Sequence, residues 1–275
     1  MSLASQYPGL LFATLASIFW AAFALIIRNA LQNAPVIKTT AIATTLDALC
    51  VTMIAAFIVP AASFLPAKRE ALFFLVLAGI LHIGLSRIFY SFALQRIGPS
   101  RAVPLALTYP FVTALLAAFW LGEPLTAFIL IGLGLLIFGI FFVVGTRPGR
   151  DTPGGQAGKR PGRADGWFAA GMSSLLWGLA GVFFKKAAPD FNPFAAASVA
   201  LWVGAMTTWL LALTVGRKES AKVIPRRNVK WILFAVLLQA TAFPSYTAAF
   251  SWTLAVRVVA IVALVPIFAL FMGWL

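Results

Sequence analysis

Long apolar stretches separated by short polar connections run along the whole chain. Each stretch is about 18–24 residues long, which is the length an α-helix needs to cross a hydrocarbon core of about 30 Å. The stretches lack the alternation of polar and apolar residues that strands of a membrane barrel show, so helices are favoured. The pattern predicts nine spans, over residues 10–27, 39–59, 71–94, 100–121, 126–144, 167–184, 194–215, 231–252 and 253–275.

The composition places these helices in lipid. Hydrophobic residues make up 62% of the 275 residues and charged residues only 10%, which excludes a soluble globular domain. The net charge of +14 would suggest nucleic-acid binding in a soluble protein. Here most basic residues lie in connections between spans, so we expect them to face lipid headgroups, with membrane lipid as the partner and no nucleic acid. The single cysteine, Cys50, cannot form an internal disulfide.

The chain contains an internal repeat. Residues 17–20 recur as residues 174–177 at an offset of 157, and Tyr90, Arg101 and Pro110 match Tyr246, Arg257 and Pro266 at an offset of 156. If each copy holds an odd number of spans, the second copy must be inverted in the membrane, with the substrate site near the midplane between the copies. We expect a first repeat over 1–146, a Gly-, Pro- and Arg-rich linker over 147–165, and a second repeat over 166–275.

A family resemblance rests on the fourth span and the turn after it. Residues 101–110 read Arg-Ala-Val-Pro-Leu-Ala-Leu-Thr-Tyr-Pro, and residues 121–126 read Leu-Gly-Glu-Pro-Leu-Thr. With the Trp20 and Trp177 helices and the repeat, this pattern resembles the EamA-like family of the drug/metabolite transporter superfamily. The resemblance implies an all-α polytopic protein with two inverted five-helix repeats around a central cavity. It also implies transport of small organic solutes, with localisation in a bacterial inner (plasma) membrane.

Two features depart from that pattern. The second repeat ends at Leu275, the equivalent of Phe119, so it lacks its fifth helix, and we expect the chain to be a fragment of a longer gene product. The resemblance implies a cytoplasmic N-terminus, whereas the distribution of Lys and Arg over the connections favours the opposite orientation. The sequence leaves the orientation open.

Polar residues within spans are candidates for the transport site, because each is costly in hydrocarbon unless it faces protein or water. Asp47 could couple transport to protons, or it could be a structural partner for an arginine. His82, Ser86 and Tyr90 recur every four residues and predict one stripe on the third span, lining the cavity or bonding other helices. His82 is a second candidate for proton coupling. Further candidate substrate-binding residues are Tyr109, Gln239 and Tyr246, of which Tyr246 is the repeat mate of Tyr90.

Other candidates are aromatic or cationic. Trp20, Trp177 and Trp202 could wall the cavity or anchor the protein at the membrane surface. Arg101 and Arg257 could bind a carboxylate or phosphate at a helix start, or lipid headgroups. Three prolines, Pro104, Pro110 and Pro266, predict helix kinks. Glycines Gly132, Gly134 and Gly139 predict close helix packing, and Glu123 predicts a cap on the next helix in the chain.

The interpretation that unites these features is a secondary-active transporter working by alternating access. We expect it to export a small organic metabolite, such as an amino acid or a similar amphipathic compound. A flippase of a lipid-linked substrate and an intramembrane enzyme remain alternatives. We expect no enzymatic activity, no cofactor and no metal site, because nucleophile motifs, phosphate loops and metal-ligand spacings are missing from the sequence. The sequence does not indicate an oligomeric state.

Overall fold

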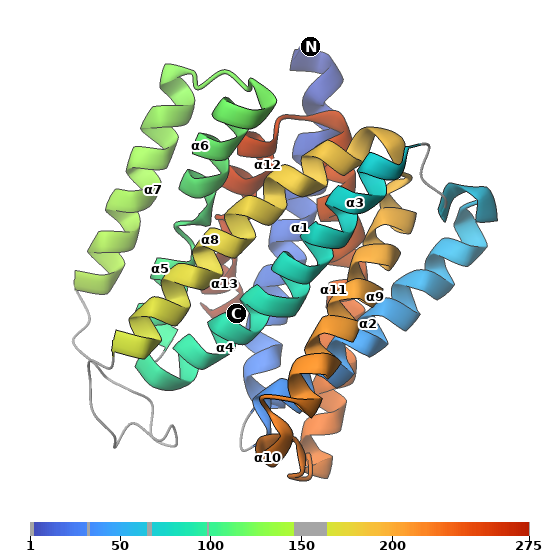
Figure 1. The fold of residues 1–275 in the computed structure, drawn as a ribbon. Helices are drawn as coiled ribbons and strands as arrows, with labels where there is room; N and C mark the ends of the chain where they lie inside the picture. Colours follow the sequence, from blue (N-terminus) through green and yellow to red (C-terminus); the bar gives the residue numbers. More distant parts are fainter. Residues whose placement is uncertain (1–2, 32–33, 65–67, 98, 146–163, 275) are drawn as a thin grey trace.

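The protein is a bundle of long helices in the computed structural model (Figure 1). The structure describes residues 3–31, 34–64, 68–97, 99–145 and 164–274, so the basic linker predicted over 147–165 falls outside the described residues except for its last two. The helices are α1 (Leu3–Ala30), α2 (Val36–Ile58), α3 (Arg69–Ala78), α4 (Ser86–Ile97), α5 (Pro99–Ala106), α6 (Tyr109–Leu121), α7 (Ala127–Gly145), α8 (Ala164–Ala187), α9 (Pro193–Leu213), α10 (Arg217–Ser220), α11 (Arg226–Trp252), α12 (Ala255–Val262) and α13 (Val265–Trp274).

Short elements complete the chain. Two 3₁₀ turns, η1 (Ala61–Phe64) and η3 (Ala188–Asp190), lie in connections, and a π-helix, η2 (Gly79–Leu85), joins α3 to α4 without a break. When helices that follow one another within a span are taken together and the four-residue α10 is set aside, the described residues form nine helical stretches, which confirms the number of spans predicted from the hydrophobic pattern. Seven of these stretches are long and apolar enough to cross a membrane by length and composition.

The two repeats run in opposite directions. In Figure 1 α1 descends from the N-terminus, whereas its repeat mate α8 rises from the lower end of the bundle to the upper end. The first helix of each repeat packs on the third span of the other, because α1 contacts α11 and α8 contacts α4. The second helices, α2 and α9, pack on each other. This exchange of partners is what an approximate two-fold axis in the membrane plane produces.

The fourth span of each repeat is broken at the same place. In the first repeat α5 ends at Ala106 and α6 begins at Tyr109; in the second α12 ends at Val262 and α13 begins at Val265. Pro110 and Pro266 each occupy the second position of the helix after the break. A proline there lacks the N–H that would continue the preceding hydrogen-bond ladder, so the helix restarts. Pro104 lies inside α5 without ending it.

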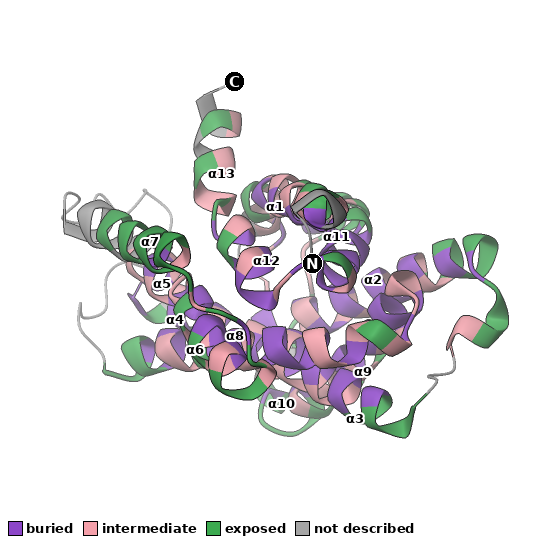
Figure 2. Ribbon diagram, turned by 90° about the horizontal axis from the view of Figure 1, so that it is seen from above, coloured by how far each residue is buried: buried purple, intermediate pink, exposed green. Residues whose placement is uncertain are grey.

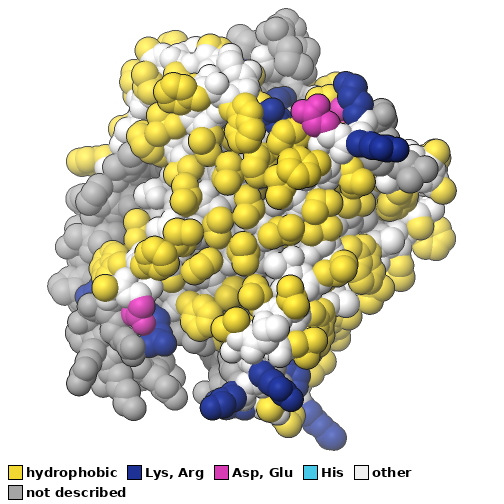
Figure 3. Space-filling view, in the orientation of Figure 1, with side chains coloured by type: hydrophobic (Ala, Val, Ile, Leu, Met, Phe, Trp, Pro, Cys, Tyr) yellow, Lys and Arg dark blue, Asp and Glu magenta, His cyan; other side chains and the backbone are white. Residues whose placement is uncertain are grey.

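Small residues fill the interior and large apolar residues cover the outside. The largest buried cluster contains many alanines, from Ala13 on α1 to Ala249 on α11, which allow the helices to approach closely. Figure 2 shows buried positions concentrated where α1, α8, α9, α11 and α12 face one another. Phenylalanines such as Phe57 and Phe119, each 90% exposed, point outward. In Figure 3 hydrophobic side chains cover the middle of one face, with Lys and Arg above and below, as expected for a lipid-facing belt.

Close helix contacts occur at glycines other than the predicted ones. A Cβ added at Gly178 on α8 would lie 2.5 Å from Val112, and one at Gly204 on α9 would lie 2.3 Å from Ile83. Added Cβ atoms at Gly132, Gly134 and Gly139 on α7 meet nothing within 4 Å, so the prediction that these three permit close packing is wrong for the described structure. The reason is that α7 packs with little of the bundle, and most of its described side chains are exposed.

Candidate functional site

A cluster of rings lies where the two repeats meet in the middle of the bundle. Its members are linked in a chain of ring contacts with centroid separations of 4.8 to 6.2 Å. We call it the central aromatic cluster, and it consists of Trp20, His82, Tyr90, Tyr109, Trp177, Phe184, Phe243, Tyr246 and Phe250.

The cluster follows the approximate two-fold axis. Trp20 of the first repeat packs on Tyr246 of the second, with centroids 4.9 Å apart and planes tilted by 56°. Their mates Trp177 and Tyr90 pack in the same way at 5.2 Å and 49°. The matching tyrosines therefore each contact the tryptophan of the opposite repeat. Tyr246 is only 1% exposed, so the cluster belongs to the interior of the bundle.

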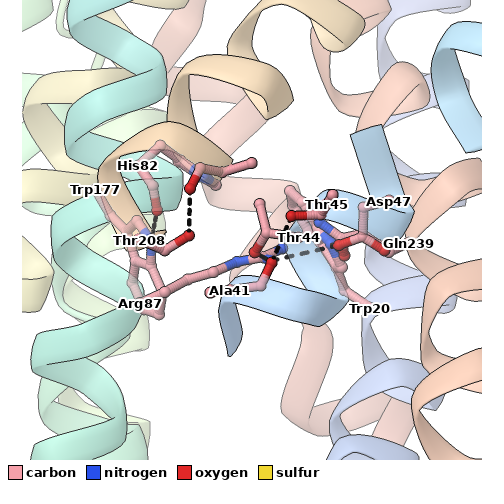
Figure 4. Close-up of polar contacts among 11 residues, drawn as sticks. Trp20, Ala41, Thr44, Thr45, Asp47, His82, Arg87, Trp177, Thr208 and Gln239 are labelled. Atoms are coloured by element: carbon pink, nitrogen blue, oxygen red, sulfur yellow. Dashed lines mark hydrogen bonds and ion pairs between the residues drawn. The ribbon is translucent and has the colours of Figure 1, made fainter. Parts of the chain in front are cut away.

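Both indole N–H groups donate across the repeat interface. Trp20 Nε1 donates to Gln239 Oε1 at 2.8 Å, and Trp177 Nε1 donates to the backbone oxygen of His82 at 3.1 Å (Figure 4). At the offset of 157 Gln239 is the mate of His82, so each tryptophan bonds the equivalent position of the other repeat. One acceptor is a side-chain amide and the other is a backbone carbonyl.

The π-helix η2 explains why a backbone carbonyl is free to accept. The N–H of Ser86 donates to Leu81 O, five residues back, and not to His82 O, its ordinary α-helical acceptor. The His82 carbonyl accepts instead from Ser86 Oγ at 2.7 Å and from Trp177 Nε1. A local irregularity of the third span thus supplies, inside the bundle, the acceptor for the Trp177 indole of the other repeat.

The irregularity coincides with a difference of one residue between the repeats. The third span begins at Arg69 and its mate α11 at Arg226, an offset of 157, whereas Tyr90 and Tyr246 are offset by 156. The first repeat therefore carries one extra residue between Arg69 and Tyr90. That interval contains η2, while α11 is α-helical throughout. A π-helix is how a helix accommodates an additional residue without losing its direction, and such segments are frequent at functional sites.

Several buried polar atoms near the cluster have no hydrogen-bond partner within the described residues. They include Ser17 Oγ, His82 Nδ1, Gln239 Nε2 and Tyr246 OH. Leaving such an atom unpaired costs about 1–3 kcal/mol, and such groups in native proteins call for an explanation. Together they offer both donors and acceptors to a polar solute, next to faces that suit its apolar part.

A buried ion pair lies beside the cluster (Figure 4). Arg87 Nη1 lies 3.5 Å from Asp47 Oδ2, and the same nitrogen donates to Thr44 Oγ1 at 3.2 Å. The Asp47 side chain is 2% exposed and that of Arg87 16%. Asp47 therefore has an arginine partner, which was one of the two interpretations open for it. Arg87 was not among the candidates predicted from the sequence, although an arginine within an apolar span is itself a signal of a buried partner.

The other candidate residues lie farther from the cluster centre. Tyr109 contacts Trp177 with centroids 6.0 Å apart, and its hydroxyl donates to Val259 O at 3.5 Å. Trp202 on α9 is 37% exposed and donates to Thr52 Oγ1 at 3.0 Å, so it faces the α2–α9 contact and not the cluster.

The two repeat-mate arginines lie at opposite ends of the bundle. Arg101 is in the first turn of α5, and Arg257 is in the first turn of α12, where it donates to Gln6 Oε1 of α1. Figure 1 shows these helix starts at the lower and the upper end respectively, so the arginines do not form one joint anion site. Inversion of the repeats separates them by necessity, because mates at a helix start exchange membrane faces.

Glu123 caps a helix of the other repeat. Its Oε1 accepts from Ala255 N at 2.8 Å and its Oε2 from Val256 N at 3.2 Å, at the start of α12. The prediction that it caps the next helix in the chain, α7, is therefore wrong. Gly122 ends α6 with a left-handed conformation, φ +67°, which directs the next residue inward. Sequence adjacency to α7 could not reveal a partner 132 residues away.

The turn between α11 and α12 is held from both sides. Lys185 Nζ at the end of α8 donates to Phe250 O and Thr253 O, each at 2.7 Å. A cation thus meets the C-terminus of α11 and the Glu123 carboxylate meets the N-terminus of α12, the arrangement that helix dipoles favour. Lys185 belongs to the same repeat as α11 and α12, whereas Glu123 belongs to the other, so the Glu123 contact ties the two repeats together at the end of the bundle that carries the N-terminus.

A separate cavity of about 240 Å³ lies at the same end, and none of its lining residues belongs to the central aromatic cluster. Its charged groups largely have partners already: Lys68 Nζ lies 3.7 Å from Asp190 Oδ1, and Lys186 Nζ lies 4.6 Å from the centre of the Phe74 ring. Because these charged groups already have partners, we assign no solute site to this cavity.

Comparisons with known proteins agree with this architecture. A family model described as the EamA-like transporter family matches residues 7–145 and 166–275, which are the two repeats. A solved structure titled "Crystal structure of protein" is similar over 97% of this chain and 87% of that chain, with a TM-score of 0.74 and 18% sequence identity, which shows a shared fold. Comparison with curated proteins gives no match.

Proposed function

Since this chain belongs to the EamA-like transporter family, and is therefore a multi-pass membrane transporter and not an enzyme, we propose that it exports a small organic metabolite. The solute class that we propose is an amino acid or a similar amphipathic compound. The membrane that we propose is the bacterial inner membrane, as the family resemblance of the sequence implies.

The observation that carries this proposal is the central aromatic cluster with its unpartnered polar atoms. Several contacts at its core join one repeat to the other, such as Trp20 with Tyr246 and Trp177 with Tyr90. A solute bound there would contact both repeats at once. Rocking of one repeat against the other would then open the same site to either side, which is the principle of alternating access.

The fold supplies elements at which such movement can occur. The breaks at 107–108 and 263–264 interrupt the fourth span of each repeat, and the π-helix η2 interrupts the third. Hinges in proteins are a few residues at the ends of elements, where backbone angles can change without disturbing a packed core. The α11–α12 turn is held by hydrogen bonds with Glu123 and Lys185, so a movement of the repeats at this end would have to break the Glu123 contact.

We also propose that protons drive transport through Asp47 or His82. Asp47 is a buried carboxylate paired with Arg87, and His82 Nδ1 is a buried ring nitrogen without a partner within the described residues. Intramembrane groups of this kind commonly serve as proton relays. Asp47→Asn should abolish accumulation against a gradient while exchange at saturating solute continues; unchanged uphill transport in this variant would refute the role of Asp47.

The function is tested first by a thermal-shift screen of the purified protein against amino acids, nucleosides, sugars and organic cations. A ligand that binds only the folded state raises the apparent melting temperature. Hits are then tested for counterflow in proteoliposomes. If solute exchanges only in sealed vesicles that contain the protein, transport is supported; chemical conversion of a hit in detergent would support an enzyme instead. A flippase of a lipid-linked substrate would need a joint headgroup site, and Arg101 and Arg257 do not supply one, because α5 and α12 begin at opposite ends of the bundle.

A further inference from the structure

We propose that Asp47 and Arg87 form the binding site for the charged end of a zwitterionic solute, which inserts between the two side chains. Arg87 would bind the carboxylate of an α-amino acid and Asp47 its ammonium group. This inference rests on the proposed transport function and specifies the solute class and two residues that recognise it.

The geometry of the pair is that of a weak ion pair, whose two groups could exchange partners with a solute. Arg87 meets Asp47 through one nitrogen at 3.5 Å, whereas strong guanidinium–carboxylate pairs are bidentate and about 2.7–2.9 Å long. Both carboxylate oxygens of Asp47 are buried without a hydrogen bond within the described residues. A carboxylate that is 2% exposed and accepts no hydrogen bond is poorly satisfied, and an ammonium group would supply the missing donors.

The fold itself does not require the pair. At the offset of 157 the mate of Asp47 is Gly204, and after η2 the offset of 156 makes Phe243 the mate of Arg87. The second repeat therefore builds the same helices with a glycine and an aromatic ring at these positions. Gly204 packs against Ile83, and Phe243 is fully buried. An ion pair present in one repeat and replaced by apolar packing in the other is better explained by function than by stability, because buried pairs contribute little to stability.

The pair is placed so that the rest of a bound solute would reach the cluster. The guanidinium of Arg87 lies 5.9 Å from the centre of the Phe23 ring on α1, three residues after Trp20. On its own span Arg87 comes directly after Ser86, whose hydroxyl bonds the His82 carbonyl that also accepts from Trp177. Figure 4 shows Arg87 extending from its helix towards Asp47 and Thr44 on α2. An amino acid held at this point could direct its side chain to the aromatic faces.

The neutrality of the site explains why it should select zwitterions over singly charged solutes. The pair by itself is neutral, and it stays neutral when a zwitterion enters, because each new contact matches opposite charges. A lone amine or a lone carboxylic acid anion would leave one uncompensated charge buried in the membrane, which is strongly unfavourable. The site should therefore prefer a zwitterion over either of its singly charged analogues.

The test measures binding of matched probes to the full chain in detergent. The probes are L-leucine, 3-methylbutan-1-amine and 4-methylpentanoate, with the corresponding set based on L-phenylalanine. We expect wild type to bind one or both amino acids about 10- to 150-fold more tightly than the amine or the acid, as expected for the loss of one charged hydrogen bond. Arg87→Gln should lose the preference for the amino acid over the amine, and Asp47→Asn should lose the preference over the acid.

Controls separate this site from general effects of charge. Arg96 and Asp165 form a surface pair with the same 3.5 Å separation but side chains 39% and 47% exposed, so Asp165→Asn should leave the preferences unchanged. If the single variants fail to fold, the neutral double variant Asp47→Asn/Arg87→Gln removes both charges together and should bind all three probes of a set equally.

Several results would overturn the inference. These are equal binding of amine and amino acid by wild type, no binding of any probe by wild type, or wild-type preferences in both single variants. If Arg87→Gln and Asp47→Asn exchange some other solute in proteoliposomes as wild type does, the zwitterion site is refuted while the proposed transport function is supported. If wild type shows counterflow with no solute of the screen, both the zwitterion site and the proposed transport function are refuted.

Discussion

Removal of the Glu123 carboxylate should weaken the contact between the two repeats. Each oxygen accepts one backbone N–H of α12, and the side chain belongs to a residue that is 7% exposed. Hydrogen bonds to charged groups contribute about 1.5–3 kcal/mol each, and an N-cap about 0.5–2 kcal/mol. Because these terms overlap, we expect Glu123→Ala to lower the free energy of unfolding by about 3–5 kcal/mol. Glu123→Gln, which keeps one acceptor oxygen, should cost about 1–2 kcal/mol.

Thermal unfolding of the purified protein, followed by tryptophan fluorescence, measures this difference. For a chain of this size 1 kcal/mol corresponds to about 2–4 °C, so Glu123→Ala should melt about 10 °C below wild type. Glu70 is the control, because its carboxylate also lies at the N-terminal end of a helix, in the first turn of α3, but is exposed to solvent. Glu70→Ala should cost less than about 1 kcal/mol. Equal melting temperatures for the two alanine variants would refute the reasoning that burial and the pairing with α12 give Glu123 its effect.

Three further substitutions test the packing and the π-helix. Gly178→Ala should lower stability by about 1–3 kcal/mol because its Cβ would overlap Val112, while Gly132→Ala should be neutral or slightly stabilising, as measured by melting temperature. Trp177→Phe should cost about 1–2 kcal/mol and speed hydrogen exchange in η2, because the His82 carbonyl loses one of its two donors; unaltered exchange there would show that the indole does not stabilise the segment.

The sequence predicted the spans well because the bilayer fixes both their length and their composition. The predicted third span over 71–94, for example, corresponds to α3, η2 and α4 over 69–97. The π-helix within it was not predicted, since the hydrophobic pattern of a π-helix differs from that of an α-helix only by a small shift in phase. The signal was present in the repeat offsets, which change from 157 to 156 along the chain.

The site residues were predicted as candidates but not as partners. Trp20, His82, Trp177, Gln239 and Tyr246 were selected because polar and aromatic groups are costly or informative within lipid, and the structure brings them together. Their roles in substrate binding stay predictions until a ligand is found. Matching the two repeats along the sequence could not show which candidate residue of one repeat contacts which residue of the other, because these contacts depend on how the helices of the two copies interleave.

The sequence by itself indicated that the chain lies in lipid, that it is helical, that it contains a duplication and which family it resembles. Each of these follows from composition or from comparing stretches of sequence with one another. Tertiary structure decided which buried groups meet: Arg87 with Asp47, Glu123 with the start of α12, and Trp177 with a carbonyl released by the π-helix. Such contacts join residues from 40 to more than 130 positions apart, and only the crossing of inverted helices sets the distances between them.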